Sequence, residues 1–361
     1  MTNYEMSVLH FFKNKKVFIT GHTGFKGSWL SYILLKAGAE ITGFSMCPPT
    51  DPSLFEQLRL ARDMQSIIGD IADLERLSRV FYETNPEIVL HLAAQPIVRE
   101  SYKNPVLTYQ TNVMGTVNIL ECVRNCDSVC SVLNVTTDKV YKNKEGKWGY
   151  RENEELCGFD PYSNSKSCSE LVTYCYQNSF FEKREIAVST ARAGNVIGGG
   201  DFANDRIIPD CFRMASKGED ILVRNPHSIR PYQHVLEPLM SYLTIVAKQS
   251  GQRELAGNYN IGPDEADCVS TKELVGLFCD SWQKFVGNRP RWKSQNENGP
   301  HEANCLMLDC TMFKKTFSWK PVWHIDKAVD KTVEWYSVYA KGGNVKAVME
   351  KQINEFVKDR I

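Results

Sequence analysis

A tyrosine and a lysine four residues apart carry the strongest chemical signal in this sequence. Tyr162 and Lys166 would lie one above the other on the same face of a helix. There the ammonium group would lower the pKa of the phenol from about 10 towards the working pH. A phenolate so placed can take the proton of a substrate hydroxyl while a hydride leaves the same carbon. The pair therefore predicts a site for hydride-transfer chemistry.

A second polar cluster stands upstream, at the end of a predicted strand. Residues 129–135 form an apolar run, and Thr136, Thr137, Asp138 and Lys139 follow it directly. Ligands of open parallel sheets bind outside the carboxyl ends of the strands. Thr137, Asp138 and Lys139 are therefore candidate catalytic residues.

A glycine-rich turn near the start of the chain predicts a phosphate site. The β-branched run at residues 17–20 leads into Gly21, Gly24 and Gly27, and an apolar helix follows as far as Gly38. Glycines let the chain turn tightly and let backbone N–H groups at a helix N-terminus approach a pyrophosphate. We therefore expect a dinucleotide to bind at this turn.

The elements around these residues predict an α/β fold with a Rossmann-like, doubly wound parallel sheet. Helical segments alternate with predicted strands at residues 17–20, 41–44, 66–71, 87–94, 129–135 and 186–191. The alternation breaks after Asn195. We expect residues 1–196 to form the cofactor-binding domain, which holds the Tyr/Lys pair. Residues 197–361 would form mainly a smaller α/β substrate-binding lobe, and segments of the two can interleave.

Composition excludes several classes of function. The 361 residues carry 43 basic and 43 acidic side chains and no basic run, so non-specific nucleic-acid binding has no electrostatic support. No segment reaches the roughly 20 apolar residues of a membrane span, and we expect a cytoplasmic protein. The twelve cysteines are irregularly spaced without a Cys-x-x-Cys pair, so we expect reduced thiols in small core positions and no metal site.

Several further motifs occur in a fixed order. They are Thr20-Gly21-His22-Thr23-Gly24-Phe25-Lys26-Gly27, His91-Leu92-Ala93-Ala94-Gln95, Thr111-Asn112, Tyr162-x-x-x-Lys166, Arg192-x-x-Asn195-Val196 and Arg230-Pro231-Tyr232-Gln233-His234-Val235. With them the chain resembles the extended short-chain dehydrogenase/reductases that modify nucleotide sugars, and among these the 4,6-dehydratases. Residues 21–30, 192–201, 224–238 and 300–303 resemble the members that act on CDP-glucose.

The resemblance implies a redox-neutral dehydration that uses NAD and serves deoxysugar biosynthesis, for example that of lipopolysaccharide O-antigen. Tyr162 would take the proton of the sugar's 4-hydroxyl, with Thr137 near the 4-oxygen and Lys166 on the nicotinamide ribose. Asp138 would protonate the departing 6-hydroxyl, its pKa raised by burial. Related dehydratases have Glu where this chain has Lys139. We expect Lys139 to take the proton on carbon 5 as a neutral amine; alternatively, it only stabilises the enolate.

The resemblance also implies which residues bind the ligands. The cofactor would contact Gly21, Thr23, Gly24, Phe25, Lys26, Gly27, Asp70, Ile71, Leu92, Ala93, Ala94, Asn112, Tyr162 and Lys166. The nucleotide sugar would contact Gln95, Asn195, Arg206, Arg230 and His301. Arg230 is the first candidate for the diphosphate, because a guanidinium matches phosphate geometry. His22 and His91 are expected to support the structure. The acidic residue that usually binds the adenosine ribose is absent, since the second strand ends in Phe44-Ser45-Met46.

Other functions stay open at this level. One alternative is a 4-epimerase or a dehydratase for another nucleotide sugar; Asp138 argues against an epimerase, which needs no acid for a departing hydroxyl. Another is a scaffold that kept the fold without catalysis, which the Thr137, Tyr162 and Lys166 set disfavours. The resemblance further implies a homodimer or a dimer of dimers, paired through helices near 106–124 and 162–180.

Overall fold

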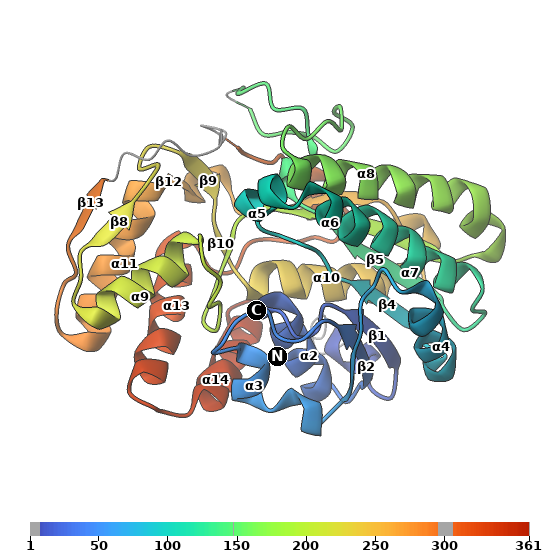
Figure 1. The fold of residues 1–361 in the computed structure, drawn as a ribbon, viewed down its shortest axis with the longest axis horizontal. Coiled ribbons are helices and arrows are strands. Elements are labelled where there is room, and N and C mark those ends of the chain that lie inside the picture. Colours follow the sequence, from blue (N-terminus) through green and yellow to red (C-terminus); the bar gives the residue numbers. More distant parts are fainter. Residues whose placement is uncertain (1–7, 147, 295–305, 361) are drawn as a thin grey trace.

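A seven-stranded, all-parallel sheet forms the centre of the molecule (Figure 1). The computed structural model describes residues 8–146, 148–294 and 306–360. The strand order is β11-β6-β5-β4-β1-β2-β3. The strands are β1 (Lys16–Thr20), β2 (Glu40–Ser45), β3 (Gln65–Ile68), β4 (Ile88–His91), β5 (Ser131–Val135), β6 (Ala187–Ala193) and β11 (Asn258–Ile261). The chain reverses its winding between β1 and β4, so the predicted doubly wound sheet is confirmed.

Both faces of the sheet are covered, which explains why its strands read as continuous apolar runs. In β1, Val17 and Ile19 belong to the core on one face, and Phe18 belongs to the core on the other. The helices α2 (Phe25–Lys36) and α10 (Leu236–Gln249) cover the first face. The second face is covered by α4 (Leu74–Thr84), α7 (Gly115–Arg124) and α8 (Pro161–Tyr176).

A smaller α/β region lies beside the carboxyl ends of the strands (Figure 1). It is built from α9 (Ile207–Lys217), α11 (Thr271–Val286), α13 (Ile325–Ala340) and the short pairs β8 (Ile221–Val223) with β13 (Trp292–Ser294) and β9 (Ile229–Pro231) with β12 (Cys268–Ser270). A third pair joins β7 (Val196–Ile197) to β10 (Gln233–His234). Both α10 and β11 follow residue 197 yet belong to the sheet layer. The domain boundary after residue 196 stays a prediction.

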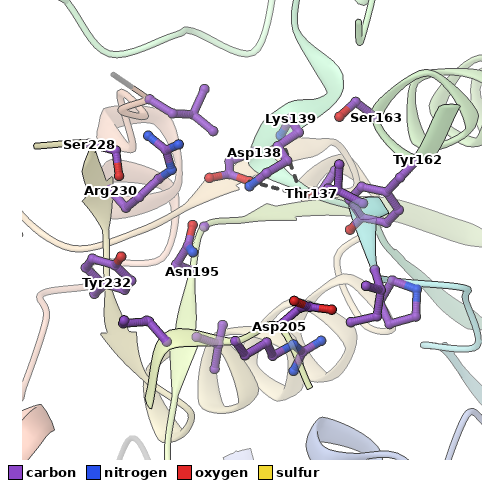
Figure 2. Close-up of a pocket in the computed structure, with 18 of the residues that line it drawn as sticks. Thr137, Asp138, Lys139, Tyr162, Ser163, Asn195, Asp205, Ser228, Arg230 and Tyr232 are labelled. Carbon is purple, nitrogen blue, oxygen red and sulfur yellow. Dashed lines mark hydrogen bonds and ion pairs between the residues drawn. The ribbon is translucent and has the colours of Figure 1, made fainter. Parts of the chain in front are cut away.

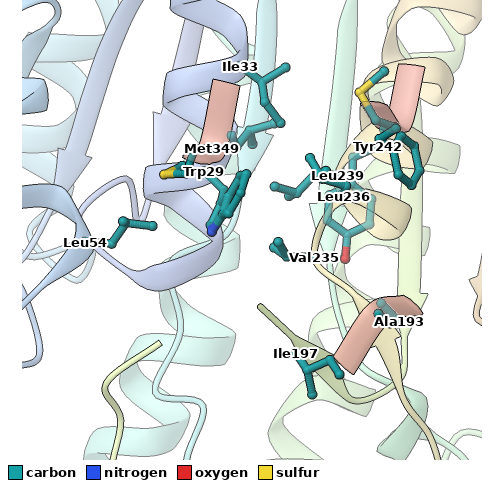
Figure 3. Packing of buried hydrophobic residues seen from close by; sticks show 14 of the residues in the cluster. Trp29, Ile33, Leu54, Ala193, Ile197, Val235, Leu236, Leu239, Tyr242 and Met349 are labelled. Carbon is teal, nitrogen blue, oxygen red and sulfur yellow. The ribbon is translucent and has the colours of Figure 1, made fainter. Parts of the chain in front are cut away.

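The C-terminal helix α14 (Val345–Asp359) ties this region to the first helix of the sheet layer. Met349 is fully buried and packs near Trp29 and Leu54, as Figure 3 shows. On the surface, Glu350 accepts hydrogen bonds from Tyr32 and Lys36 of α2. Helix α14 therefore packs against α2 and completes the hydrophobic core on that side.

The structure differs from the sequence expectations at several elements. The helix expected at 106–124 is three pieces, α6 (Pro105–Tyr109), a π-helical turn η2 (Gln110–Met114) and α7, and α8 runs into a second such turn, η4 (Gln177–Phe181). The third strand ends at Ile68 and not at Ile71. Unpredicted helices are α3 (Leu54–Leu58), α5 (Val98–Lys103) and α12 (Thr311–Thr316).

The cysteine expectation is only partly right. The cysteines in the described part of the chain are unpaired thiols, and Cys122, Cys126, Cys211, Cys279 and Cys310 fill the core as expected. However, Cys47, Cys157 and Cys175 are exposed. Among the described residues, no helix combines the length and the apolar character needed to cross a bilayer.

Candidate active site

A cavity of about 960 Å³ opens between the sheet layer and the smaller region, at the carboxyl ends of β5 and β6. The fold brings together most of the chemical residues that the sequence pointed to, as Figure 2 shows. The lining of the cavity includes Phe25, Lys26, Thr137, Asp138, Lys139, Tyr162, Asn195, Arg206 and Arg230. Residues from the glycine turn, β5, α8 and both halves of the chain therefore meet in one space.

Thr137, Asp138 and Lys139 lie at the start of a short 3-10 turn, η3 (Asp138–Val140), directly after β5. The Thr137 hydroxyl donates to Asp138 Oδ1 at 3.0 Å. Lys139 Nζ lies 3.5 Å from that same oxygen, and its side chain is 29% exposed. The second carboxyl oxygen of Asp138, Oδ2, is buried and has no hydrogen-bond partner within the described residues. Asp138 can therefore still bind a hydroxyl group of a ligand.

Tyr162 and Lys166 lie on the first two turns of α8, which begins at the N-cap Asp160 and Pro161. Both side chains are buried. Burial raises the pKa of Tyr162 to about 12, although the side chain of Thr137 and the charge of Arg206 act in the opposite direction. Burial and the charge of Lys26 lower the pKa of Lys166 to about 7. The expected lowering of the Tyr162 pKa by Lys166 is therefore wrong for this structure.

Burial explains this difference, and Lys166 is bound to the backbone at the end of β5. Lys166 Nζ donates to the Val135 carbonyl at 3.0 Å, at the end of β5. It is thereby fixed under the strand that carries the threonine and aspartate of the site. Desolvation disfavours the charged forms of both the phenol and the amine, so each is pushed towards its neutral form.

The glycine turn has the shape of a cradle for an anion. Gly21 has φ +77°, and a Cβ there would lie 2.7 Å from the Ala93 nitrogen. A Cβ on Gly27 would lie 2.1 Å from the Gly21 carbonyl oxygen. Gly24 is the N-cap of α2 and provides no side-chain cap, so N–H groups of the first turn face outward. Free N–H groups at the positive end of a helix fit a pyrophosphate.

Several expected cofactor residues are used to build the walls of this cradle. Thr23 Oγ1 hydrogen-bonds Ser45 Oγ at 2.8 Å and donates to the Met46 carbonyl at 2.9 Å. The N–H groups of Leu92 and Ala93 donate to Thr20 Oγ1, at 3.1 Å each. Ala94 continues this segment. The cradle is thus fixed between the ends of β1, β2 and β4.

Asp70 and Ile71 lie just after β3. Asp70 is exposed and accepts from the Ala72 N–H at 2.9 Å. Ile71 is buried, and it lies so close to Gly115 that a Cβ there would be 2.7 Å from Ile71 Cγ2. Their contact with a cofactor stays a prediction.

Asn112 and Gln95 already have protein partners for their side chains. Asn112, in the π-helical turn η2, accepts from the Gln95 N–H at 2.8 Å and donates to Ser165 Oγ at 2.9 Å. Gln95 Nε2 donates to Thr108 Oγ1, and its Oε1 accepts from the Ile97 N–H. Both side chains therefore brace the loop after β4, and their predicted ligand contacts stay untested.

The two histidines have the supporting roles that were expected. His91 Nδ1 hydrogen-bonds Thr20 Oγ1 at 2.7 Å and joins the ends of β4 and β1. His22 Nε2 hydrogen-bonds Ser66 Oγ at 2.7 Å. Burial lowers the pKa of His22 to about 4, so this ring is neutral at physiological pH.

The expected substrate residues differ in the hydrogen bonds and ion pairs that their side chains make within the protein. Asn195 Oδ1 is buried and unpartnered within the described residues, which suits a ligand contact. Arg206 pairs with Asp201 at 2.8 Å. Arg230 is 6% exposed, and one of its N–H groups donates to the Ile229 carbonyl at 2.9 Å. His301 lies outside the described residues.

The cavity lining also contains charged and polar side chains to which the sequence analysis assigned no role. Arg224 pairs with Asp205 at 2.6 Å and reaches Asp210 at 3.7 Å. Arg99, Ser228 and Tyr232 also belong to the lining. Arg224 and Tyr232 lie inside the quoted stretch 224–238, which gave a signal for them. Arg99 lies on the short helix α5 and Asp205 in the turn before α9, and no sequence pattern marks either residue; only the tertiary fold brings them here.

Lys26 adds a positive charge at the junction of the glycine turn and the cavity. Its Nζ lies 6.0 Å from the centroid of the Tyr242 ring. Burial and the charge of Arg206 lower its pKa to about 8, while Asp138 and Asp201 act against this shift. With Arg206 and Arg230, this lysine places basic side chains in a lining that also contains Asp138, Asp201 and Asp205.

Comparison with known proteins points to one family. A family model described as GDP-mannose 4,6 dehydratase matches residues 18–332. The CDP-glucose 4,6-dehydratase of Salmonella typhimurium is 44% identical over 354 residues, which is 96% of this chain and 98% of that protein. The dTDP-glucose 4,6-dehydratase of a Xanthomonas campestris strain is 24% identical over 332 residues, 88% of this chain and 92% of that protein.

Solved structures with the same fold include epimerases and dehydratases. An epimerase from Methanothermobacter thermautotrophicus has a TM-score of 0.80 at 20% identity and covers 96% of this chain and 98% of its own. A dTDP-glucose 4,6-dehydratase from Streptomyces venezuelae, solved with NAD, has a TM-score of 0.76 at 22% identity, covering 91% and 98%. At these identities the likeness concerns the fold alone.

Proposed function

The chain belongs to the GDP-mannose 4,6 dehydratase family, and from that membership we propose that it is an NAD-dependent CDP-glucose 4,6-dehydratase. It would convert CDP-glucose to CDP-4-keto-6-deoxyglucose and water. The observation that carries the proposal is the 44% identity to a CDP-glucose 4,6-dehydratase over almost the full length of both chains. The cavity, which gathers Thr137, Asp138 and Tyr162, supports it.

NAD fits the residues around the glycine turn. The uncapped N-terminus of α2 and the close backbone approach at Gly21 and Gly27 suit its pyrophosphate. Thr23, Phe25, Ala93 and Ala94 would form the adjoining walls. When bound, NAD supplies the acceptor and then the donor of one hydride, so the overall reaction is redox-neutral.

Tyr162 and Lys166 would serve the first proton transfer. Tyr162 takes the proton of the 4-hydroxyl while the hydride leaves carbon 4, and Thr137 hydrogen-bonds the 4-oxygen. Lys166, fixed at the Val135 carbonyl, holds a positive charge beneath this site when it is protonated. The charge of Arg206 favours the phenolate, which burial otherwise disfavours.

Asp138 and Lys139 would carry out the loss of water. The 4-keto group acidifies the hydrogen on carbon 5; Lys139 Nζ takes this proton, and Asp138 gives a proton to the 6-hydroxyl as the carbon–oxygen bond breaks. The two groups lie 3.5 Å apart, so a proton gained by the lysine can return to the carboxylate. Alternatively, Lys139 only stabilises the enolate by its charge.

Basic and polar residues of the smaller region would hold the nucleotide diphosphate. Arg230 and Arg206 provide guanidinium groups, and the unpartnered Asn195 Oδ1 provides an acceptor in the same cavity. Gln95 and His301 complete the proposed set of substrate residues.

We further propose that the protein acts as a homodimer or a dimer of dimers in the cytoplasm, in deoxysugar biosynthesis. Apolar side chains are exposed along two neighbouring helices, among them Val106, Leu107, Met114, Leu171 and Tyr174. Several exposed apolar side chains on neighbouring helices are typical of a subunit interface. The proposed reaction involves neither a nucleic acid nor a membrane as a partner.

The test is direct. Purified protein is incubated with NAD and, in separate reactions, with CDP-, dTDP-, UDP- and GDP-activated hexoses, and the 4-keto-6-deoxy product is detected by its alkali-induced absorbance. A signal with CDP-glucose alone is the expected result. A signal with another nucleotide only would overturn the substrate. Silence with every sugar would overturn the dehydratase and leave the epimerase and the non-catalytic scaffold, which epimer-resolving NMR of the products would then distinguish.

A further inference from the structure

A fully buried ion pair lies next to the proposed catalytic segment but does not line the cavity. Glu170 is one turn after Lys166 on α8, and Arg192 is on β6. Arg192 Nη2 lies 2.9 Å from Glu170 Oε2, and each side chain is 1% exposed. Two charges removed from water lose their hydration, and well-packed apolar residues could often replace them without loss of stability. Global stability alone therefore does not explain this pair.

The carboxylate joins the helix of Tyr162 to the strand of Asp138. Glu170 Oε1 accepts a hydrogen bond from the hydroxyl of Thr136, the residue directly before Thr137. Its Oε2 accepts from Thr190 Oγ1 at 2.7 Å, on the neighbouring strand β6. One carboxylate thus links α8 to the residue that follows β5 and to the middle of β6. The hydrogen bond from Thr136 fixes the start of the segment that contains Thr137.

The guanidinium holds the other end of the same segment. Arg192 Nη1 donates to Tyr141 Oη at 2.8 Å and to the Glu152 carbonyl at 2.8 Å. The Arg192 guanidinium lies 5.2 Å from the centroid of the Tyr141 ring. Tyr141 in turn donates to Asn260 Oδ1 of β11 at 2.6 Å. Tyr141 comes two residues after Lys139, so the chain that carries Lys139 is held from both sides.

We propose that Glu170 and Arg192 are positioning residues, which hold segment 136–141 against α8 so that Thr137, Asp138 and Lys139 face Tyr162. The inference rests on the proposed function and adds residues that touch neither substrate nor cofactor. Because the two charges are buried and neutralise each other, they can fix the segment without adding net charge to the cavity. Small displacements of reacting groups have large effects on rate, which gives the pair its importance.

A matched pair of substitutions tests this inference. Thr136→Val and Thr190→Val each remove one hydroxyl that donates to the same Glu170 carboxylate, with little change in volume. Only the first breaks the link to the catalytic segment. We expect Thr136→Val to lower kcat about 10-fold or more with KM within about two-fold, and Thr190→Val to change kcat by less than about two-fold. Thr136→Ser, which restores the hydroxyl, should recover most of the lost kcat.

A double variant separates position from stability. Glu170→Leu removes both accepting oxygens; alone it leaves a buried unpaired guanidinium and is expected to destabilise the fold, so it is combined with Arg192→Met. The double variant should melt near the wild-type temperature and still show a kcat reduced about 10-fold or more. Wild-type kcat in a folded double variant, or equal kcat for Thr136→Val and Thr190→Val, would overturn the inference while the wild type stays active. A wild-type protein inactive on every activated hexose would instead overturn the proposed function, and the inference with it.

Discussion

At the scale of single residues, burial disfavours the charged forms of both the proposed base, Tyr162, and its neighbour Lys166. Burial raises the pKa of Tyr162 to about 12 and lowers that of Lys166 to about 7. A phenolate therefore forms only if nearby positive charge stabilises it, and Arg206 is the cation that acts in this direction. The site can hold the proton until a substrate hydroxyl and a hydride acceptor are both present.

Removal of the phenol hydroxyl should abolish most of the activity. Tyr162→Phe keeps the ring and its packing but has no group that can take the 4-hydroxyl proton. We expect kcat to fall about 10²- to 10⁴-fold, in the range of general-base catalysis. Tyr174→Phe is the control, because Tyr174 lies on the same helix with 61% of its surface exposed. A Tyr162→Phe enzyme within about three-fold of the wild type would contradict the assignment.

Lys139 can be tested separately from hydride transfer. Lys139→Met removes the amine beside Asp138, so loss of water should slow about 100-fold while the first hydride transfer continues. In a single turnover, the absorbance of reduced nicotinamide should then accumulate. Lys144→Met, in the same loop and 60% exposed, is the control. Elimination at the wild-type rate would exclude Lys139 both as the base and as the stabilising charge.

The residue types of this site could be predicted from spacing, whereas their environments could not. The Tyr-x-x-x-Lys pair and the polar residues after residue 135 were found from the sequence because strand ends and helix faces follow local patterns. The pKa values depend on burial, which arises when α8 packs on β5. The pairing of Arg224 with Asp205 and the network around Glu170 join residues far apart in the chain, so no local pattern reveals them.

At the scale of elements, the buried carboxylate of Glu237 on α10 links the sheet layer to α13. Its Oε1 accepts from the Val322 and Trp323 N–H groups, at 2.7 and 2.8 Å, just before that helix begins. Oε2 is buried without a hydrogen-bond partner in the described part of the chain. Burial raises the pKa of Glu237 from 4.5 to about 7.

Stability should therefore decrease as the pH rises through the titration of Glu237. The raised pKa means that the folded protein binds more protons than the unfolded chain between about pH 4.5 and pH 7. At pH 8 the carboxylate lowers the free energy of unfolding by about 3 kcal/mol relative to pH 4. Glu237→Gln keeps the accepting oxygen and removes this dependence.

Urea unfolding at several pH values measures this effect. The difference in free energy of unfolding, Glu237→Gln minus wild type, should grow by about 2.5 kcal/mol between pH 5 and pH 8. Glu254→Gln, at an exposed position, should leave the wild-type pH dependence unchanged. A difference that does not change with pH would show that Glu237 is ionised in the folded protein throughout.

Element prediction succeeded for apolar strands and failed where tertiary contacts decide. Most of the central strands are runs of β-branched and other apolar residues, and they were predicted. The seventh strand, β11, reads Asn-Tyr-Asn-Ile and has no such signal. Asn260 is buried there because its side chain donates to the Tyr150 carbonyl at 2.7 Å. The π-helical turn η2 likewise places Asn112 towards Gln95, a requirement that helix propensity does not express.

At the scale of the whole molecule, the chain crosses between its two regions several times. It forms six strands of the sheet, builds part of the smaller region, returns for α10 and β11, and ends with α14 against α2 and α3. The cavity therefore has walls from both regions, and both must fold before it exists. Composition and periodicity predicted a sheet layer and a smaller lobe. They did not predict that α10 and β11 join the sheet layer, because this depends on which apolar faces fit together.

The exposed apolar face of α6, η2 and α8 leads to the last prediction, which concerns the proposed dimer. Leu171 is 54% exposed on the face of α8 away from the buried Ser165 and Ser169. Val106, on the neighbouring helix α6, is 69% exposed. In a two-fold dimer each substitution occurs twice, and a buried unpaired carboxylate costs a few kcal/mol per copy. Leu171→Glu should therefore raise the dissociation constant of the dimer about 100-fold or more.

Sedimentation velocity over a range of protein concentrations decides this. The wild type should sediment as a dimer or a larger assembly, and Leu171→Glu should shift it towards monomers. Met312→Glu, on α12 with Met312 40% exposed, adds the same charge away from this face and should leave the assembly intact. Because α8 carries Tyr162 on its opposite side, a monomer with reduced kcat would mean that assembly stabilises the active site. A wild type that is monomeric at every concentration would end the dimer proposal and leave this apolar face without a partner.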